Sequence, residues 1–346
     1  MTQLFQRWQT LKTEQPKLRT RDAAAALGVS EADLVDASVG EGVVRLAGPF
    51  EDIVRGLSGV GRVMALTRNE AAVHERKGRY EKVSFSPHFG LVLGPDIDLR
   101  LFMKQWASAY AVQVPSRGRV LESIQFFDGH GEAVHKVYLM NDERAAWDAL
   151  IAAHTADDQT AGGLVTTPAP APPAPNPELD VDTLLAEWGA MTDTHQFFGI
   201  LKRSGATSGQ AFAAAEGRFT RRLPTDVAAA VLHQAAEQGT PIMVFVGNRG
   251  CIQIHSGPVK AIKPMGPWIN VMDPDFNLHL HQQRVASAWH VRKPTEDGDV
   301  NSVELLDADG QVLVRFFGAR KPGVPELEGW RALAQGLEAM TEVARA

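Results

Sequence analysis

Hydrophobic and polar residues follow two spacings along this chain, and each half of the chain runs from one spacing to the other. Apolar residues three and four positions apart are typical of helices, and strict alternation is typical of half-buried strands. In each half the helical spacing comes first. The pattern predicts helices at 2–12, 21–27, 30–34, 50–57 and 144–153, and at 181–188, 195–203, 209–216, 226–237 and 325–343.

The alternating segments are short and follow one another through turns at 128–131, 248–250 and 307–310. Glycine, asparagine and aspartate at these turns favour antiparallel pairing. No helix regularly separates consecutive strands, so we predict an α+β fold with a large antiparallel sheet in each half and helices on one side. The expected strands are 63–66, 71–75, 82–86, 90–93, 99–102, 107–114, 120–127 and 133–139, then 241–246, 251–255, 260–262, 269–272, 277–282, 287–292, 300–306 and 312–317.

One stretch of the first half recurs in the second. Residues 95–139 align without a gap on 274–318, at a constant offset of 179, and 12 of the 45 pairs are identical. Other pairs exchange similar side chains, such as Lys136 with Arg315 and Tyr138 with Phe317. The chain is therefore predicted to be a tandem structural duplication. Its function is expected where the two copies differ or where they face each other.

A segment rich in proline and alanine lies between the two copies. Residues 155–178 read TADDQTAGGLVTTPAPAPPAPNPE and lack an apolar period. Such a segment is expected to form an extended, semi-rigid spacer that does not pack. We therefore predict an N-terminal repeat at 1–154, a linker at 155–178 and a C-terminal repeat at 179–346.

Composition and charge exclude several classes of protein. The net charge of −6 argues against a chain that binds nucleic acid as a whole. The single cysteine, Cys251, excludes an intrachain disulfide and a multi-cysteine metal site, and is typical of a reducing cytoplasm. The first residues contain no signal-peptide run, and no stretch approaches the roughly 20 apolar residues of a membrane span. A cytoplasmic protein without membrane insertion is expected.

Two local motifs offer alternative functions. Residues 18–36, with Gly28 at the turn, have the outline of a helix-turn-helix, but the second helix (31–36) carries three acids and no base. Contacts to DNA need basic side chains, so a DNA-binding regulator is the minor alternative. The glycines of 56–61 have the wrong spacing and context for a phosphate loop. No hydrolase motif is visible.

His279 and His281 are expected on one face of a strand, because side chains alternate there. They are a possible metal-binding pair or, more simply, two polar residues on an outer face. No third ligand is visible nearby, and a zinc site needs at least three. His279 is the repeat counterpart of Arg100, so this strand position holds a basic group in both copies.

His195 marks a difference between the copies, because Pro16 stands at the same offset in the first half. We expect His195 in the first turn of a helix that Asp193 or Thr194 caps. Phe198 and Gly199 would share its face. A helical histidine beside aromatic residues is more often a packed core residue. Here, however, a neutral imidazole, a close-approach glycine and an aromatic wall would also suit a flat iron-containing ligand.

Several motifs in the same order resemble the cytoplasmic haem-utilisation proteins of Gram-negative bacteria, the hemin-degrading factor or hemin transport protein family. The resemblance covers the chain apart from the linker. The motifs are TDTHQFF at 192–198, KPMGPWINV at 263–271, DPDFNLHL at 273–280, VRKPT at 291–295 and DLRLF at 98–102.

The resemblance implies that haem lies between two structural repeats. It assigns His195 as the axial ligand of the iron and Arg100 as the distal group that stabilises bound oxygen or water. Lys293 and Arg320 match basic positions that would hold the propionates. Phe198 and Phe317 complete the expected haem-binding set, although the family often has a tyrosine near Phe317.

Three departures leave parts of the site open. Ser208 stands where the family usually has a basic residue, and Arg221 or Arg222 is an alternative propionate contact. Arg292 is a further basic candidate that matches no family position. His281 is unfamiliar as histidine at its position, so it is a candidate for an alternative or transient haem ligand.

The expected function is to receive imported haem and either degrade it to release iron or pass it on. Degradation would need an external electron donor, because no flavin or nicotinamide motif is visible. The alternative is a haem chaperone without catalysis that delivers haem to a separate haem oxygenase. Expected partners are haem, the haem importer and that downstream oxygenase, with no nucleic acid. The chain is expected to be a monomer or weak dimer.

Overall fold

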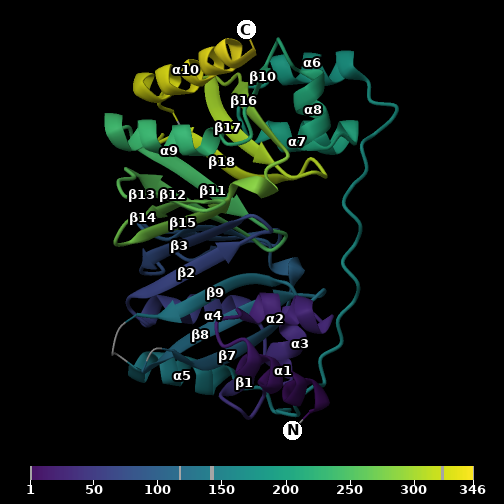
Figure 1. Cartoon of the computed structure of the whole chain (residues 1–346), viewed down its shortest axis with the longest axis vertical. Helices are drawn as coiled ribbons and strands as arrows, with labels where there is room; N and C mark the ends of the chain where they lie inside the picture. The colour runs from purple at the N-terminus through teal and green to yellow at the C-terminus, as the bar shows by residue number, and fades with distance from the viewer. Residues whose placement is uncertain (1, 117, 141–143, 321–322, 346) are drawn as a thin grey trace. The chain divides into compact units, whose positions relative to one another are not determined.

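The computed structural model describes residues 2–116, 118–140, 144–320 and 323–345. Within these residues the strands form two antiparallel nine-stranded sheets. Their strand orders are β1-β7-β8-β9-β2-β3-β15-β14-β13 and β10-β16-β17-β18-β11-β12-β6-β5-β4. The predicted α+β class with antiparallel sheets is confirmed (Figure 1). Each sheet, however, takes strands from both halves of the sequence, and not from one half as predicted.

Contacts divide the chain into two compact units. The first comprises residues up to 68, 75–170 and 247–253, and the second comprises 69–74, 171–246 and 254 onwards. The chain therefore changes unit at five places, after residues 68, 74, 170, 246 and 253. The domain boundaries expected from the sequence, at 154 and 179, stay a prediction.

The first unit begins with three short helices that lie together (Figure 1) and pack around Phe5 and Trp8. A larger hydrophobic core of the first unit surrounds Trp106, Phe126 and Trp147. The elements of the first half are α1 Gln3–Glu14, α2 Thr20–Leu27, α3 Glu31–Asp36, β1 Val43–Leu46, α4 Phe50–Gly56, η1 Leu57–Gly59, β2 Val63–Arg68, β3 Ala72–Gly78, β4 Ser84–Phe85, β5 Gly90–Leu93, β6 Asp98–Leu101, η2 Met103–Gln105, β7 Trp106–Ser116, β8 Arg119–Asp128, β9 Ala133–Leu139 and α5 Arg144–His154.

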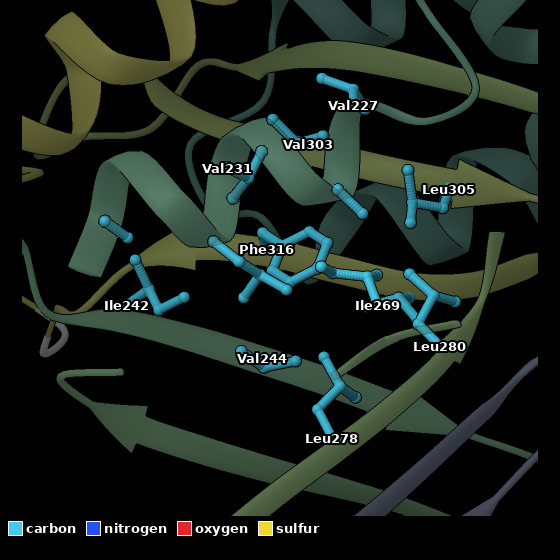
Figure 2. Close-up of a cluster of buried hydrophobic side chains, with 14 of the residues drawn as sticks. Val227, Val231, Ile242, Val244, Ile269, Leu278, Leu280, Val303, Leu305 and Phe316 are labelled. Carbon is cyan, nitrogen blue, oxygen red and sulfur yellow. The ribbon is translucent and has the colours of Figure 1, made fainter. Parts of the chain in front are cut away.

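The second unit contains two cores. Figure 2 shows part of the larger one, where Val231 of a helix lies over Phe316 and Val244 of the strands. The smaller core surrounds Trp188. The elements of the second half are α6 Val181–Gly189, α7 Gln196–Ser204, α8 Ser208–Ala214, β10 Thr220–Leu223, α9 Val227–Gln238, β11 Ile242–Gly247, β12 Cys251–Gly257, β13 Ile262–Met265, β14 Trp268–Met272, β15 Phe276–His281, η3 Gln282–Arg284, β16 Ser287–Lys293, β17 Val300–Leu306, β18 Val312–Gly318 and α10 Glu328–Arg345.

Strand pairing repeats with the offset seen in the sequence. Val112 pairs with Ser123, and Ser123 with Tyr138. Val291 pairs with Ser302, and Ser302 with Phe317, each 179 positions later. A shared register places corresponding side chains on corresponding faces, because a slip of one residue would invert every side chain. The predicted tandem duplication is confirmed.

The first part of the Pro/Ala-rich segment packs on the first unit, so the expectation that this segment makes no packing contacts is wrong there. The amide of Leu164 donates to Asp36 Oδ2 at 2.9 Å, and the amide of Thr167 donates to the Gly129 carbonyl at 2.9 Å. Leu164 also lies against a core cluster that includes Tyr110. The hydrogen bonds fix backbone groups, which an apolar period in the sequence does not reveal.

The hydrophobic pattern missed two short strands. β1 pairs with β7, and β10 pairs with β16, through four residues each. A four-residue strand contains too few positions to establish an alternation. These strands form because an adjacent long strand offers unpaired backbone groups, which is a tertiary effect.

Candidate functional site

His195 lies at the N-cap of α7, with its side chain 92% exposed. The predicted side-chain cap by Asp193 or Thr194 is wrong: His195 is itself the N-cap, without a side-chain cap bond. Instead, Gln196 Oε1 accepts the backbone N–H groups of Thr192 and Asp193, at 2.8 and 3.3 Å. The glutamine side chain therefore reaches back from the helix and holds the preceding turn.

Asp193 determines the orientation of the His195 ring. Its Oδ1 atom lies 2.7 Å from the backbone nitrogen of His195 and 2.6 Å from Nδ1. The His195 backbone N–H lowers the pKa of Asp193, against a smaller opposing effect of burial, so the carboxylate is charged at neutral pH. A carboxylate only accepts, so the proton of the neutral ring lies on Nδ1 and the lone pair on Nε2. This tautomer leaves Nε2 available as a metal ligand.

A concavity of about 470 Å³ lies beside His195 in the second unit. Met191 and Ile200 contribute apolar wall, and the side chain of Arg203 lies over Gly199, with Nη1 3.2 Å from the place where a β-carbon would stand. Arg203 donates to Glu187 Oε2 at 2.7 Å in the same wall. Phe198, one position before Gly199, is 78% exposed, an unusual exposure for a phenylalanine. The wall beside the exposed imidazole therefore combines apolar side chains with the Glu187–Arg203 ion pair.

Arg320 belongs to the same neighbourhood. Its Nη2 atom lies 3.6 Å from Asp297 Oδ2, and its side chain is 18% exposed. Its positive charge also contributes to lowering the pKa of Asp193, after larger effects of the His195 hydrogen bonds and burial. The structure thus brings Arg320 into electrostatic range of the His195–Asp193 pair, although the two segments are far apart in sequence.

Lys293 is buried in the second unit. Its Nζ atom lies 2.6 Å from Glu304 Oε1 and 4.7 Å from the centroid of the Phe197 ring. Glu304 also accepts from Arg315 Nε at 2.9 Å. Burial alone would raise the pKa of Glu304, but Lys293 and Arg315 together lower it to about 2. The ammonium of Lys293 is already neutralised within the fold.

Phe317 is half-buried on β18, and its ring meets Phe245 edge to face with centroids 5.2 Å apart. Ser208 is the first residue of α8, directly after the N-cap Thr207. Of the two alternative cations, Arg222 of β10 stands opposite Trp289 of β16. Its guanidinium lies 5.5 Å from the centroid of the Trp289 ring, next to the smaller core. Arg221 pairs with His290 and so points to the opposite face of the strand.

Arg100 belongs to the first unit, on β6, and its side chain is 34% exposed. Its guanidinium forms an ion pair with Asp98 and donates to the Leu99 carbonyl at 3.2 Å. Asp98 precedes Arg100 by two residues on the same strand, so the two side chains share a face. The role expected of Arg100 stays a prediction.

The family model described as "Haemin-degrading HemS.ChuX domain" matches residues 28–154 and 205–337. The chain belongs to the HemS.ChuX family. The matched ranges fall on either side of the Pro/Ala-rich segment, once in each repeat.

Individual HemS.ChuX proteins resemble the whole chain. The hemin transport protein HmuS of Yersinia pestis is 42% identical over 330 residues, 95% of each chain, and the hemin transport protein HemS of Yersinia enterocolitica is 40% identical over the same share. Among solved structures, the holo form of the heme-binding protein PhuS from Pseudomonas aeruginosa has a TM-score of 0.93 at 46% identity, covering 96% of this chain and 98% of that one. The heme degrading enzyme ChuS of Escherichia coli O157:H7 has a TM-score of 0.89 at 38% identity, covering 96% of this chain and 98% of that one.

The alternatives weighed from the sequence gain no support in this HemS.ChuX protein. His279 Nδ1 lies 2.7 Å from Asn270 Oδ1, and His281 meets Trp268 edge to face at 4.7 Å. In the part of the chain that the structure describes, no group of three or more histidine, cysteine or acidic side chains is placed to hold a metal ion. No helix there is long and apolar enough to cross a membrane.

The helix pair around Gly28 is present, and Gly28 adopts the left-handed conformation at the turn (φ 69°). Its second helix, α3, is almost entirely buried. Glu31 of α3 lies 2.6 Å from the Lys136 ammonium and also pairs with Arg68. A helix that reads DNA must present its side chains to the groove, whereas α3 uses them to hold the unit together.

Sequence reasoning found His195 but missed the contact between Asp193 and the imidazole ring. It treated Asp193 as a helix cap, because an aspartate just before a helical pattern is typical of one. The available signal was the spacing Asp-x-His, since an aspartate two residues earlier is close enough to reach the ring of the histidine.

Proposed function

We propose that this chain binds haem through His195 and takes part in cytoplasmic haem utilisation, receiving imported haem and degrading it or passing it on. The observation that carries the proposal is the exposed His195 imidazole, whose Nδ1 is held by Asp193 and whose Nε2 makes no hydrogen bond to the described residues. The names of the relatives, hemin transport protein, heme-binding protein and heme degrading enzyme, support it.

The residues around His195 suit haem on chemical grounds. Haem is a flat apolar ring whose iron accepts a neutral imidazole, and it supplies the redox chemistry that no side chain of the protein offers. The exposed Phe198 ring and the apolar Met191 and Ile200 offer contact to such a ring. Gly199 would permit close approach of the helix backbone once the flexible Arg203 side chain, which lies over it, moves aside.

Asp193 would act on the ligand through His195. It fixes the proton on Nδ1, so the imidazole needs no rearrangement before its Nε2 binds iron. A carboxylate partner also increases the electron donation of an axial histidine, because it stabilises positive charge on the ring. Asp193 is therefore a positioning residue of the proposed site.

Basic side chains would hold the haem propionates. Arg320 is the strongest candidate because its charge reaches Asp193, the partner of His195. Lys293 is retained as a candidate, but its ammonium would first have to leave Glu304. Arg222 is preferred to Arg221 as the substitute for the basic group absent at Ser208, since it lies next to the core that α7 helps to form. Phe317 would contribute aromatic contact.

We assign Arg100 as the distal group. Its guanidinium is permanently charged and rich in donors, so it can hydrogen-bond to a small ligand of the iron and stabilise negative charge there. Asp98 would keep the guanidinium in place through their ion pair. Electrons for degradation would come from an external donor, and the importer and a downstream haem oxygenase are the expected partners.

The axial ligand is tested by titrating haem into the purified protein and into His195→Ala while the Soret band is recorded. His88→Ala, which removes an exposed histidine of the first unit, is the matched control. We expect His195→Ala to lose the native spectrum and most of the affinity, and His88→Ala to keep both. An unchanged spectrum and affinity in His195→Ala would refute the assignment.

Degradation is separated from trafficking by a second experiment. The haem-loaded protein is treated with ascorbate in the presence of catalase, and the Soret band is followed together with the tetrapyrrole products. Loss of the band with one defined product identifies an enzyme. A stable band, or decay that catalase abolishes entirely, identifies a chaperone, because free peroxide then caused the damage.

A further inference from the structure

A second concavity in the second unit has a chemical character that haem binding through His195 does not explain. It encloses about 420 Å³ between the turn before β10, strands β16 and β17, and helix α10. Arg218, Arg221 and Arg292 line it, with His290 and Glu338. Three guanidinium groups around one hollow are unusual, since like charges repel each other.

Two of these arginines have no acidic side chain as a partner among the described residues. Arg292 pairs with Asp299 Oδ2 at 2.9 Å and donates to the Arg218 carbonyl at 2.8 Å. Arg218 and Arg221 are exposed, and within the described ranges neither guanidinium forms an ion pair with an acidic side chain. The Arg218 guanidinium lies 5.1 Å from the centroid of the Phe219 ring, which restricts its movement beside the hollow.

Glu338 does not cancel this positive charge. The backbone N–H and the amide Nδ2 of Asn301 both donate to Glu326, each at 2.6 Å, so Asn301 Oδ1 is left as an acceptor. His290 Nε2, 2.8 Å from that oxygen, must therefore donate to it. His290 Nδ1 faces Glu338 Oε1, and one further proton must lie between them. Whether the proton is on the ring or on the carboxylate, the pair has no net charge.

The other repeat shows that the fold does not require these cations. In both repeats the turn before the short strand has the same two hydrogen bonds: Gly40 to Val43 and Gln113 to Gly42 in the first, and Gly217 to Thr220 and Arg292 to Phe219 in the second. The strand registers are also the same. The positions of Arg218, Arg221, His290 and Arg292 are occupied in the first repeat by Glu41, Val44, Ala111 and Gln113.

We infer that this concavity is a binding site for a small anion carrying two or more negative charges, a phosphate or a polycarboxylate. Arg218 and Arg221 supply two uncompensated guanidinium groups, whose planar donor sets match both kinds of oxyanion. The His290–Glu338 pair, which has no net charge, lines the concavity together with buried Asn301. The inference goes beyond the proposed function, because Arg221 lies on the strand face opposite Arg222. Arg218 and Arg292 lie over Phe219, at the edge of the smaller core.

The test is isothermal titration calorimetry of the full-length, haem-free protein at low ionic strength, with inorganic phosphate, pyrophosphate and citrate as separate probes. Arg218→Gln and Arg221→Gln are compared with Lys260→Gln, which removes an exposed charge elsewhere in the same unit. We expect one probe to bind at one site per chain. Each arginine variant should weaken that binding roughly tenfold or more, and Lys260→Gln should not change it.

The pattern of affinities distinguishes the sources of the anion. Tighter binding of pyrophosphate identifies a phosphate site, and tighter binding of citrate identifies a carboxylate site. Equal affinities in all four proteins would overturn the inference, because the binding would then be a general charge effect. Stoichiometric displacement of the anion by haem would also overturn it, because the arginines would then hold the propionates of the same ligand.

Discussion

A single carboxylate oxygen of Asp193 accepts two hydrogen bonds from His195, one from its backbone N–H at 2.7 Å and one from its ring Nδ1 at 2.6 Å. The backbone bond anchors the carboxylate, and the ring bond transmits that anchoring to the imidazole. The ring is therefore oriented although 92% of it is exposed to solvent. An exposed side chain would otherwise sample several rotamers.

Asp193→Asn tests whether this contact tunes the proposed axial ligand. An amide can keep a hydrogen bond but lacks the charge that stabilises positive charge on the ring, so haem affinity should fall about 10–100-fold. In the reduced haem complex, resonance Raman spectroscopy should show the iron–histidine stretch at lower frequency. Asp182→Asn, an exposed acid of α6, is the control. An unchanged stretch would mean that Asp193 does not act through the ring.

Lys293→Met should cause a stability defect before any defect in haem binding. Its ammonium and Glu304 are both buried, so Lys293→Met removes one of the two cations that pair with the Glu304 carboxylate and should cost about 3 kcal/mol of unfolding free energy. Urea denaturation of the haem-free protein measures the cost. Arg320→Gln, at the candidate whose side chain is 18% exposed, should keep the stability and weaken haem binding. Full stability of Lys293→Met with lost haem affinity would instead make Lys293 a propionate contact.

Arg100→Gln should alter the spectrum of bound haem more than the affinity. A fixed positive charge beside a ligand of the iron favours the deprotonated form of that ligand. Without it, the pH at which the ferric spectrum changes from the acidic to the alkaline form should rise. Arg119→Gln, an exposed position on β8, should leave the transition in place. A transition at the same pH in Arg100→Gln would exclude a distal role.

His135 makes the stability of the first unit pH-dependent. It is buried between Tyr80 and Thr67, with its Nε2 2.5 Å from the Tyr80 oxygen and its Nδ1 2.9 Å from Thr67 Oγ1. Burial lowers the pKa of His135 from 6.5 to about 3. The unfolded chain therefore takes up this proton first, and the contribution of His135 is complete above pH 6.5 and declines as pH falls toward 3.

The expected slope from this residue is about 1.4 kcal/mol of unfolding free energy per pH unit below pH 6.5. Urea denaturation at pH 7, 6 and 5, followed by tryptophan fluorescence, measures it, because Trp106 lies beside His135 with ring centroids 6.3 Å apart. His135→Gln should be less stable at pH 7, since it disturbs a buried hydrogen-bonded chain, and should show a smaller slope. An identical slope in this variant would assign the pH dependence to other groups.

Much of the fold could be predicted from the sequence, because it depends on local patterns of apolar and polar residues. The period-two alternation of 107–114 and 287–292 located β7 and β16, and the offset of 179 predicted the shared strand register. His195 stood out because Pro16 stands at the same sequence offset of 179 in the first half. These features require only the order of residues along the chain, since side-chain direction in a strand follows from sequence position.

Other features depend on which distant segments meet. No pattern places Leu164 against Asp36, or the Arg320 charge near Asp193, because those relationships involve residues more than 100 positions apart. The same reason hides the opposite orientations of Arg221 and Arg222 until β10 pairs with β16. The sequence by itself determined the duplication, the antiparallel class and the candidate histidine. Tertiary structure alone decided which cations have acidic partners and which have none among the described residues, because burial and pairing are set by contacts across the fold.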